Sequence, residues 1–148
     1  MTVTRAFLRF SVFALLAVLT ACGTVTLPDG TGGAAPLIQL AGAPQDPVRS
    51  FLDAWNARDY QAMYALLSSN SQGLTSYSVF ETTYENADTA IGTQNLSYTL
   101  GASAEQGVSA TVRYDLTITS SIFGTITDPG RMMRVVKAPN NQWRIAWT

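Results

Sequence analysis

Hydrophobic and polar residues alternate strictly between Val108 and Thr119, in the stretch V-S-A-T-V-R-Y-D-L-T-I-T. The even-numbered positions carry apolar side chains, and the odd-numbered positions carry polar ones. A period of two is the spacing at which side chains share one face of a β-strand. The stretch therefore predicts a long strand with one dry face, formed by Val108, Ala110, Val112, Tyr114, Leu116 and Ile118.

Apolar residues upstream of this strand recur at helical spacing. Asp46 followed by Pro47 predicts a helix start, because a carboxylate can cap free N–H groups and proline needs no N–H partner at the first helical position. Asp59 predicts a second start, and the polar stretch 68–73 would close that short helix. A third helix is expected over about 76–90. The residues expected to point inward from these helices are Val48, Phe51, Leu52, Trp55, Met63, Leu66, Leu67, Phe80, Tyr84, Ala87 and Ile91.

Alternation elsewhere predicts three further strands. Apolar and polar residues alternate over 95–100, and a short polar turn at 104–107 joins that strand to the long one as a hairpin. Asp128-Pro129-Gly130 predicts a turn, followed by a strand over 131–137. In the last strand, 142–147, two tryptophans share a face and should close the core over the helices. The predicted fold class is α+β, with amino-terminal helices packed on a curved four-stranded antiparallel sheet.

The amino terminus carries a different kind of pattern. Arg5 and Arg9 precede an apolar run over 10–19, which is the architecture of a secretory signal and is shorter than the roughly 20 residues of a membrane-spanning helix. The run ends in Leu19-Thr20-Ala21-Cys22, which resembles the bacterial lipobox, whose cysteine is diacylated and becomes the mature amino terminus. The alternative is an idle or buried cysteine after an ordinary signal. We expect residues 1–21 to be a lipoprotein signal peptide and Cys22 to be lipidated.

Two or more acyl chains on Cys22 would anchor the protein stably. The expected location is the extracytoplasmic face of a bacterial cell membrane. Gly, Ala, Pro and Thr dominate the composition after Cys22, and few residues before Asp46 could be buried. We interpret residues 22–46 as a flexible tether and residues 47–148 as the folded domain.

Composition narrows the function classes. With 47% hydrophobic and 13% charged residues and a formal net charge of -1, the chain is typical of a globular protein and does not indicate nucleic-acid binding. It contains no His, the commonest general base and metal ligand, and its single Cys excludes an internal disulfide. Glu81, Glu85 and Asp88 could be imagined as a cation site, but without further oxygen ligands they favour a solvated acidic face. We expect no metal and no cofactor.

Four segments together carry a family resemblance. They are P-V-R-S-F-L-D-A-W-N-A-R-D-Y-Q-A-M-Y-A-L-L-S at 47–68, F-E-T-T-Y-E-N at 80–86, A-T-V-R-Y-D-L-T-I at 110–118 and V-V-K-A-P-N-N-Q-W-R-I-A-W at 135–147. The chain resembles the amino-terminal domain of class B penicillin-binding proteins of the methicillin-resistance type, which has the cone-shaped nuclear-transport-factor-2-like fold. Several members of that group also begin with a lipobox.

The resemblance implies a non-catalytic domain that stands a transpeptidase off the membrane. The transpeptidase chemistry needs a serine nucleophile in an S-x-x-K motif. The only lysine of this chain is Lys137, and Arg134 occupies the position that the serine would need. Either the sequence is part of a larger enzyme or it is a stand-alone copy of the domain.

Three functions remain open at this point. The first is a lipid-anchored, non-enzymatic spacer or interaction domain, held to the membrane through Cys22 and meeting cell-wall synthesis proteins. The second is a small-molecule binder whose pocket lies in the mouth of the cone, lined by Trp55, Tyr64, Tyr84, Tyr98 and Tyr114. The third is an enzyme of the ketosteroid-isomerase or dehydratase kind, which is disfavoured because the chain has no His and Asp115 is expected to point outward.

Overall fold

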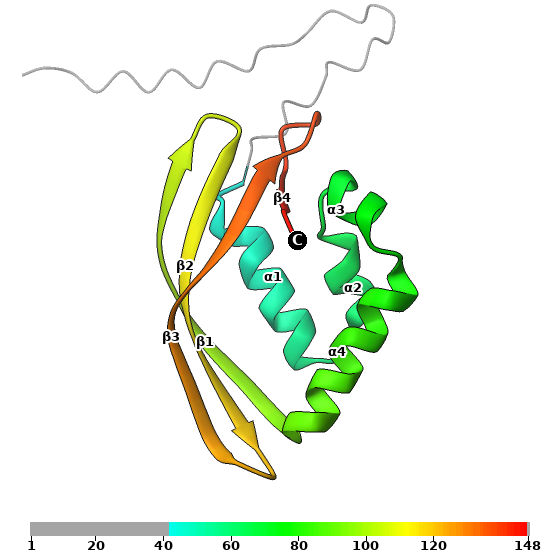
Figure 1. Cartoon of the computed structure of the whole chain (residues 1–148). Coiled ribbons are helices and arrows are strands. Elements are labelled where there is room, and N and C mark those ends of the chain that lie inside the picture. Colours follow the sequence, from blue (N-terminus) through cyan, green and yellow to red (C-terminus); the bar gives the residue numbers. More distant parts are fainter. Residues whose placement is uncertain (1–41, 148) are drawn as a thin grey trace, which may run out of the picture. The chain divides into compact units, whose positions relative to one another are not determined.

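The computed structural model describes residues 42–147 of the chain (Figure 1). Cys22, the predicted signal peptide and most of the predicted tether lie outside the described residues, so these assignments stay predictions. The helices are α1 (Gln45–Asn56), α2 (Tyr60–Ala65), α3 (Ser69–Leu74) and α4 (Tyr77–Ile91), and the strands are β1 (Thr93–Gln106), β2 (Ser109–Ser120), β3 (Gly124–Lys137) and β4 (Trp143–Ile145). None of these helices is long and apolar enough to cross a membrane.

The start of α1 differs from the prediction. Pro44 already has helical dihedral angles, and α1 begins at Gln45, so Asp46 lies inside the first turn and is not the cap. Its carboxylate instead accepts a hydrogen bond from the Ala43 N–H at 2.8 Å. The prediction of a cap at Asp46 was wrong because two residues upstream of it also take part in the first helical turn.

The other helix starts follow their capping residues. Asp59 accepts a hydrogen bond from the Ala62 N–H at 2.9 Å and opens α2, as predicted. Ser76 accepts from the Val79 N–H and opens α4, which ends at Gly92 in the left-handed conformation. The polar stretch 68–73 was wrongly expected only to close the preceding helix. Ser68 caps a further short helix there, α3, by accepting a hydrogen bond from the Ser71 N–H.

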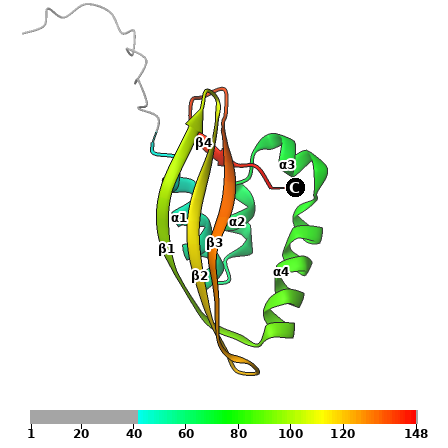
Figure 2. The same cartoon turned by 60° about the vertical axis from the view of Figure 1, so that its left-hand side comes forward.

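The strands form one antiparallel sheet in the order β1-β2-β3-β4. The sheet is curved, and the helices cover one of its faces (Figure 2). The alternation along β2 is confirmed, because its even-numbered side chains from Ala110 to Ile118 are at most 7% exposed. The prediction was wrong for Val108, whose side chain is 71% exposed in the turn between β1 and β2.

The Asp128-Pro129-Gly130 segment does not reverse the chain. The reversal between β2 and β3 lies at 121–123, and β3 continues through 128–130 as one strand. The pairing register of β2 with β3 shifts between Tyr114 and Leu116, so the segment is accommodated as a bulge. Gly130 has a positive φ of 73°, and its N–H donates to the Asp115 carboxylate at 2.7 Å. A sequence typical of a turn is thus absorbed by an irregularity within the strand.

The core lies between the helices and the concave face of the sheet. Its fully buried side chains come from helices and strands alike, and they include Val48, Phe51, Leu52, Met63, Phe80, Val112, Val135 and Ile145. The end of α2 pairs with β4, since the Ser68 N–H donates to the Ile145 carbonyl at 2.8 Å and the Ile145 N–H donates to the Leu66 carbonyl at 2.9 Å. The predicted α+β class, with helices on a curved four-stranded sheet, is confirmed.

Candidate functional site

Asp88 is the most unusual polar residue of the described domain. It lies on α4, is only 6% exposed, and accepts two hydrogen bonds. The donors are the Trp55 indole N–H at 3.2 Å and the Tyr60 hydroxyl at 2.9 Å. A buried carboxylate is costly unless it is hydrogen-bonded, and these two donors from α1 and α2 satisfy it. The expectation that Asp88 belongs to a solvated acidic face was therefore wrong.

The sequence held one signal for this burial. Asp88 continues the spacing of Phe80 and Tyr84 along α4, where residues four apart share one face. Phe80 is fully buried, and its ring centroid lies 4.7 Å from that of Tyr84. The position of Asp88 on this stripe is predictable from the sequence, but its two partners, 33 and 28 residues away in the chain, are not.

Tyr60 acts as a permanent hydrogen-bond donor to Asp88. Burial, and next the hydrogen bond to Asp88, raises the pKa of Tyr60 to about 12. A phenol with such a pKa stays protonated near neutral pH, so it does not serve as a general base there. The Trp55–Tyr60–Asp88 cluster therefore joins α1, α2 and α4.

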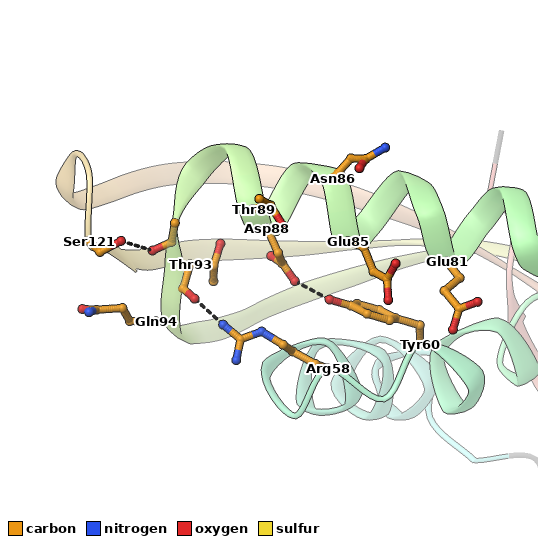
Figure 3. A pocket seen from close by; sticks show the side chains of 11 residues that line it. Arg58, Tyr60, Glu81, Glu85, Asn86, Asp88, Thr89, Thr93, Gln94 and Ser121 are labelled. Atoms are coloured by element: carbon orange, nitrogen blue, oxygen red, sulfur yellow. Dashed lines mark hydrogen bonds between the residues drawn. The ribbon is translucent and has the colours of Figure 1, made fainter.

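An open hollow of about 750 Å³ lies next to this cluster (Figure 3). Its walls come from the segment between α1 and α2, from one side of α4 and from the start of β1. Arg58, the one cation among its lining residues, donates a hydrogen bond to the Thr93 carbonyl. The lining residues are Arg58, Tyr60, Glu81, Glu85, Asn86, Asp88, Thr89, Gly92, Thr93, Gln94 and Ser121.

The hollow is acidic and polar. Three carboxylates, those of Glu81, Glu85 and Asp88, face it against the single guanidinium of Arg58. Glu81 accepts a hydrogen bond from the Tyr77 hydroxyl at 2.6 Å, and this bond, followed by burial, raises the pKa of Tyr77 to about 12. Within residues 42–147, no group of three His, Cys, Asp or Glu side chains is arranged to hold a metal ion. The arrangement is suited to cationic or hydrogen-bonding partners.

The five aromatic residues predicted to line a pocket lie elsewhere. Tyr114 is buried in the core, and Trp55, Tyr64, Tyr84 and Tyr98 pack against it. Among the five, the rings of Trp55 and Tyr84 contact each other, with centroids 5.4 Å apart. None of the five lines the large hollow or the two smaller hollows of about 350 and 270 Å³.

The hydroxyl groups of two of these tyrosines are engaged within the domain. The Tyr98 hydroxyl donates to the Asp53 carboxylate at 2.6 Å, and that of Tyr64 donates to the Thr75 carbonyl at 2.9 Å. Burial raises the pKa of Tyr84 to about 12. Ligand binding by the five aromatic residues stays a prediction.

The last two strands and the residues after them are joined by contacts of one lysine and two tryptophans. Lys137 of β3 pairs in register with Trp143 of β4, and its ammonium nitrogen lies 4.8 Å from the centroid of the Trp143 ring. Trp147 follows, with its ring 5.5 Å from that of Phe80 on α4. The lysine and the two tryptophans thus join the last strand to its neighbour and to the helices.

Comparison with known protein families identifies the family of this chain. The family model of the NTF2-like N-terminal transpeptidase domain matches residues 43–148. The chain belongs to this family. The resemblance seen in the sequence is thereby confirmed for the N-terminal transpeptidase domain, and among curated proteins no sequence gives a significant match.

Solved structures similar to this NTF2-like domain support the fold alone, because their sequence identities are low. A SEC-C motif containing protein from Rhodopseudomonas palustris is 16% identical, with a TM-score of 0.56 over 71% of this chain and 76% of that one. A calcium/calmodulin-dependent protein kinase type II association domain from Thiobacillus denitrificans is 14% identical, with a TM-score of 0.54 over 71% and 90%. A protein with a ketosteroid isomerase-like fold from Catenulispora acidiphila, in complex with trimethylamine, is 10% identical, with a TM-score of 0.51 over 70% of this chain and 85% of that one.

Proposed function

We propose that the protein is a lipid-anchored, extracytoplasmic spacer and interaction domain of peptidoglycan synthesis, with no catalytic role of its own. The observation that carries this proposal is the family match over residues 43–148, which relates the folded part to the N-terminal domain of transpeptidases. Fold alone does not confer a reaction, so the residues of this chain have to be considered separately.

The described residues support a non-catalytic role. A catalytic acid or base has to be free to exchange its proton with a substrate. Asp88, the most buried carboxylate, is held by Trp55 and Tyr60, and Asp115 on the sheet accepts the Gly130 N–H on the exposed side. The sequence also contains no His and no S-x-x-K motif. The small-molecule alternative is not favoured, because the aromatic residues expected to line its pocket belong to the core or pack against it.

The proposed anchor is Cys22, and the predicted tether would connect it to α1. A domain on such a tether would position a partner, or a following domain, at a distance from the membrane. This role requires only a stable fold and a surface that the partner recognises. A domain without a reactive centre can meet both requirements.

The anchor and the partner can be tested in the producing cell. Cys22→Ser should move the protein from the membrane fraction to the soluble fraction or leave it unprocessed, whereas Cys22→Ser with no change in membrane retention at the mature size would contradict lipidation. The native protein, cross-linked in the membrane and purified, should carry cell-wall synthesis enzymes. Their consistent absence, under conditions that preserve a known complex of such enzymes, would contradict the interaction role.

A further inference from the structure

Two large apolar side chains project from the turn between β2 and β3. The side chains of Ile122 and Phe123 are 60% and 65% exposed. The turn is nevertheless well ordered by hydrogen bonds, since the Ser120 hydroxyl accepts from the Ile122 N–H at 3.0 Å and from the Phe123 N–H at 2.8 Å. The Ser121 N–H donates to the Gly92 carbonyl at 2.8 Å. The backbone that carries the apolar pair is therefore held by hydrogen bonds on both sides of the turn.

The apolar pair adjoins the acidic hollow. A Cβ atom placed on Gly92 would lie 3.0 Å from Ile122 Cγ1, so Ile122 packs directly over Gly92. Gly92 and Ser121 both line the hollow. Ile122 and Phe123 thus stand at one end of a hollow whose charges are mainly carboxylates. We call this combined area, Ile122 and Phe123 with Arg58, Glu81, Glu85 and Asp88, the distal surface.

The distal surface lies far from the start of the domain. In Figure 1 the β2–β3 turn is at the opposite end of the sheet from the first turn of α1, to which the predicted tether would connect. Its carboxylates would also be repelled by anionic lipid headgroups, which attract basic surfaces. The charge of the surface therefore argues against a membrane as the occupant.

We propose that the distal surface binds a segment of a partner protein in which an apolar side chain is flanked by Lys or Arg. The apolar side chain would contact Ile122 and Phe123, and the cationic groups would lie along the hollow beside Glu85. Aromatic side chains are enriched at protein interfaces, and opposite charges increase specificity and association rate. The volume of about 750 Å³ is sufficient for several side chains. This inference rests on the proposed interaction function and specifies its surface.

A peptide-binding experiment tests the surface directly. The probe is the fluorescein-labelled peptide Gly-Ser-Lys-Leu-Arg-Leu-Lys-Ser-Gly, titrated with the full chain in detergent and followed by fluorescence anisotropy. Phe123→Ser should weaken binding about tenfold, because a central aromatic side chain carries much of the energy of such a contact. Glu85→Gln should weaken binding a few-fold and reduce its salt dependence.

Matched controls come from the other end of the sheet. Val108→Ser removes an equally exposed apolar side chain from the β1–β2 turn, and Glu105→Gln removes an exposed carboxylate from the end of β1. Neither should change the affinity. The proposal is overturned if no binding is detected up to millimolar protein, if Val108→Ser acts as strongly as Phe123→Ser, or if the same peptide with Glu in place of its cations binds equally well. It is also overturned if phosphatidylglycerol vesicles bind the chain and Phe123→Ser abolishes that binding.

The cell-based experiment separates this inference from the proposed function. If cell-wall synthesis enzymes are captured by the native protein and lost with Phe123→Ser at unchanged protein level, both are supported. If capture persists with Phe123→Ser, the interaction function stands and the distal surface is the wrong site. If capture fails with the native protein while the peptide binds in vitro as expected, the proposed function fails and the surface remains a binding site.

Discussion

The hydrogen bonds of Asp88 should contribute measurably to the stability of the domain. Asp88→Ala removes an acceptor of two hydrogen bonds and leaves the Tyr60 hydroxyl, in a side chain only 8% exposed, without its partner. The Trp55 N–H is better placed to find water, because Trp55 is only partly buried. A hydrogen bond to a charged group contributes about 1.5–3 kcal/mol, and a stranded buried donor adds to the cost, so we expect a loss of about 3 kcal/mol of unfolding free energy. For a domain of this size that is a decrease in Tm of roughly 15 °C.

Urea unfolding of the purified domain, followed by far-UV circular dichroism, measures this loss. Asp88→Asn keeps the shape and one good acceptor, so it should cost about 1.5 kcal/mol. The control is Glu85→Gln, one turn earlier on α4 and exposed, which should change stability by less than about 0.5 kcal/mol. A double-mutant cycle of Asp88→Asn with Tyr60→Phe should give a coupling of about 1 kcal/mol. Wild-type stability of Asp88→Asn together with zero coupling would refute the reasoning.

Three further predictions follow from other parts of the structure. Phe80→Ala removes a fully buried ring and should cost about 3–5 kcal/mol in urea unfolding, whereas Phe123→Ser at the exposed turn should cost less than about 0.5 kcal/mol; equal losses would mean that the core is misassigned. Gly92→Ala should cost about 1–3 kcal/mol, because φ is 67° and the new Cβ would lie 2.4 Å from the Ser121 hydroxyl oxygen. Gly73→Ala, with open space around its Cβ, should be neutral or slightly stabilising in the same assay. Since the pKa of Tyr60 is raised from 10.0 to about 12 in the folded state, its contribution to stability is fully present below pH 10 and is lost as the pH rises from 10 to 12. Absorbance titration at 295 nm should show one fewer late-titrating phenol in Tyr60→Phe, and an unchanged curve would contradict the shift.

One part of the candidate site, the position of Asp88 on α4, could be predicted from the sequence. The spacing of Phe80, Tyr84 and Asp88 on α4 places a carboxylate on the buried stripe of that helix. The residues that satisfy it could not be predicted, because Trp55 and Tyr60 approach Asp88 only when α1, α2 and α4 pack together. The assignment to a solvated face failed for Asp88 for the same reason, whereas Glu85 is exposed as predicted. The spacing of apolar residues predicts which side of a helix faces the core. It does not predict which polar side chains form hydrogen bonds there.

The exposure of Ile122 and Phe123 at the β2–β3 turn could likewise not be predicted from the sequence. The sequence pattern predicted a turn at 128–130, downstream of Ile122 and Phe123. In the folded domain the Ser120 hydroxyl organises the reversal at 121–123, and Asp115 supports the bulge at Gly130. The Ser120 hydroxyl and its two N–H partners belong to the same turn, whereas the Asp115 carboxylate and the Gly130 N–H join two strands. Of the two contacts, only the second depends on residues distant in the chain.

What the sequence determined by itself is the set of local features with a short-range cause. The alternation of β2 and the cap at Asp59 depend on neighbours a few residues apart, and together with the other local patterns they identify the α+β fold and the NTF2-like family. The strand predicted over 142–147 is shorter in the structure, because β4 ends at Ile145 and Trp147 lies beyond it. Tertiary structure alone decided the burial of Asp88, the continuity of β3 and the position of the apolar turn beside the acidic hollow. Each of these depends on contacts between segments distant in the chain, where the free energy of packing selects among several locally acceptable conformations.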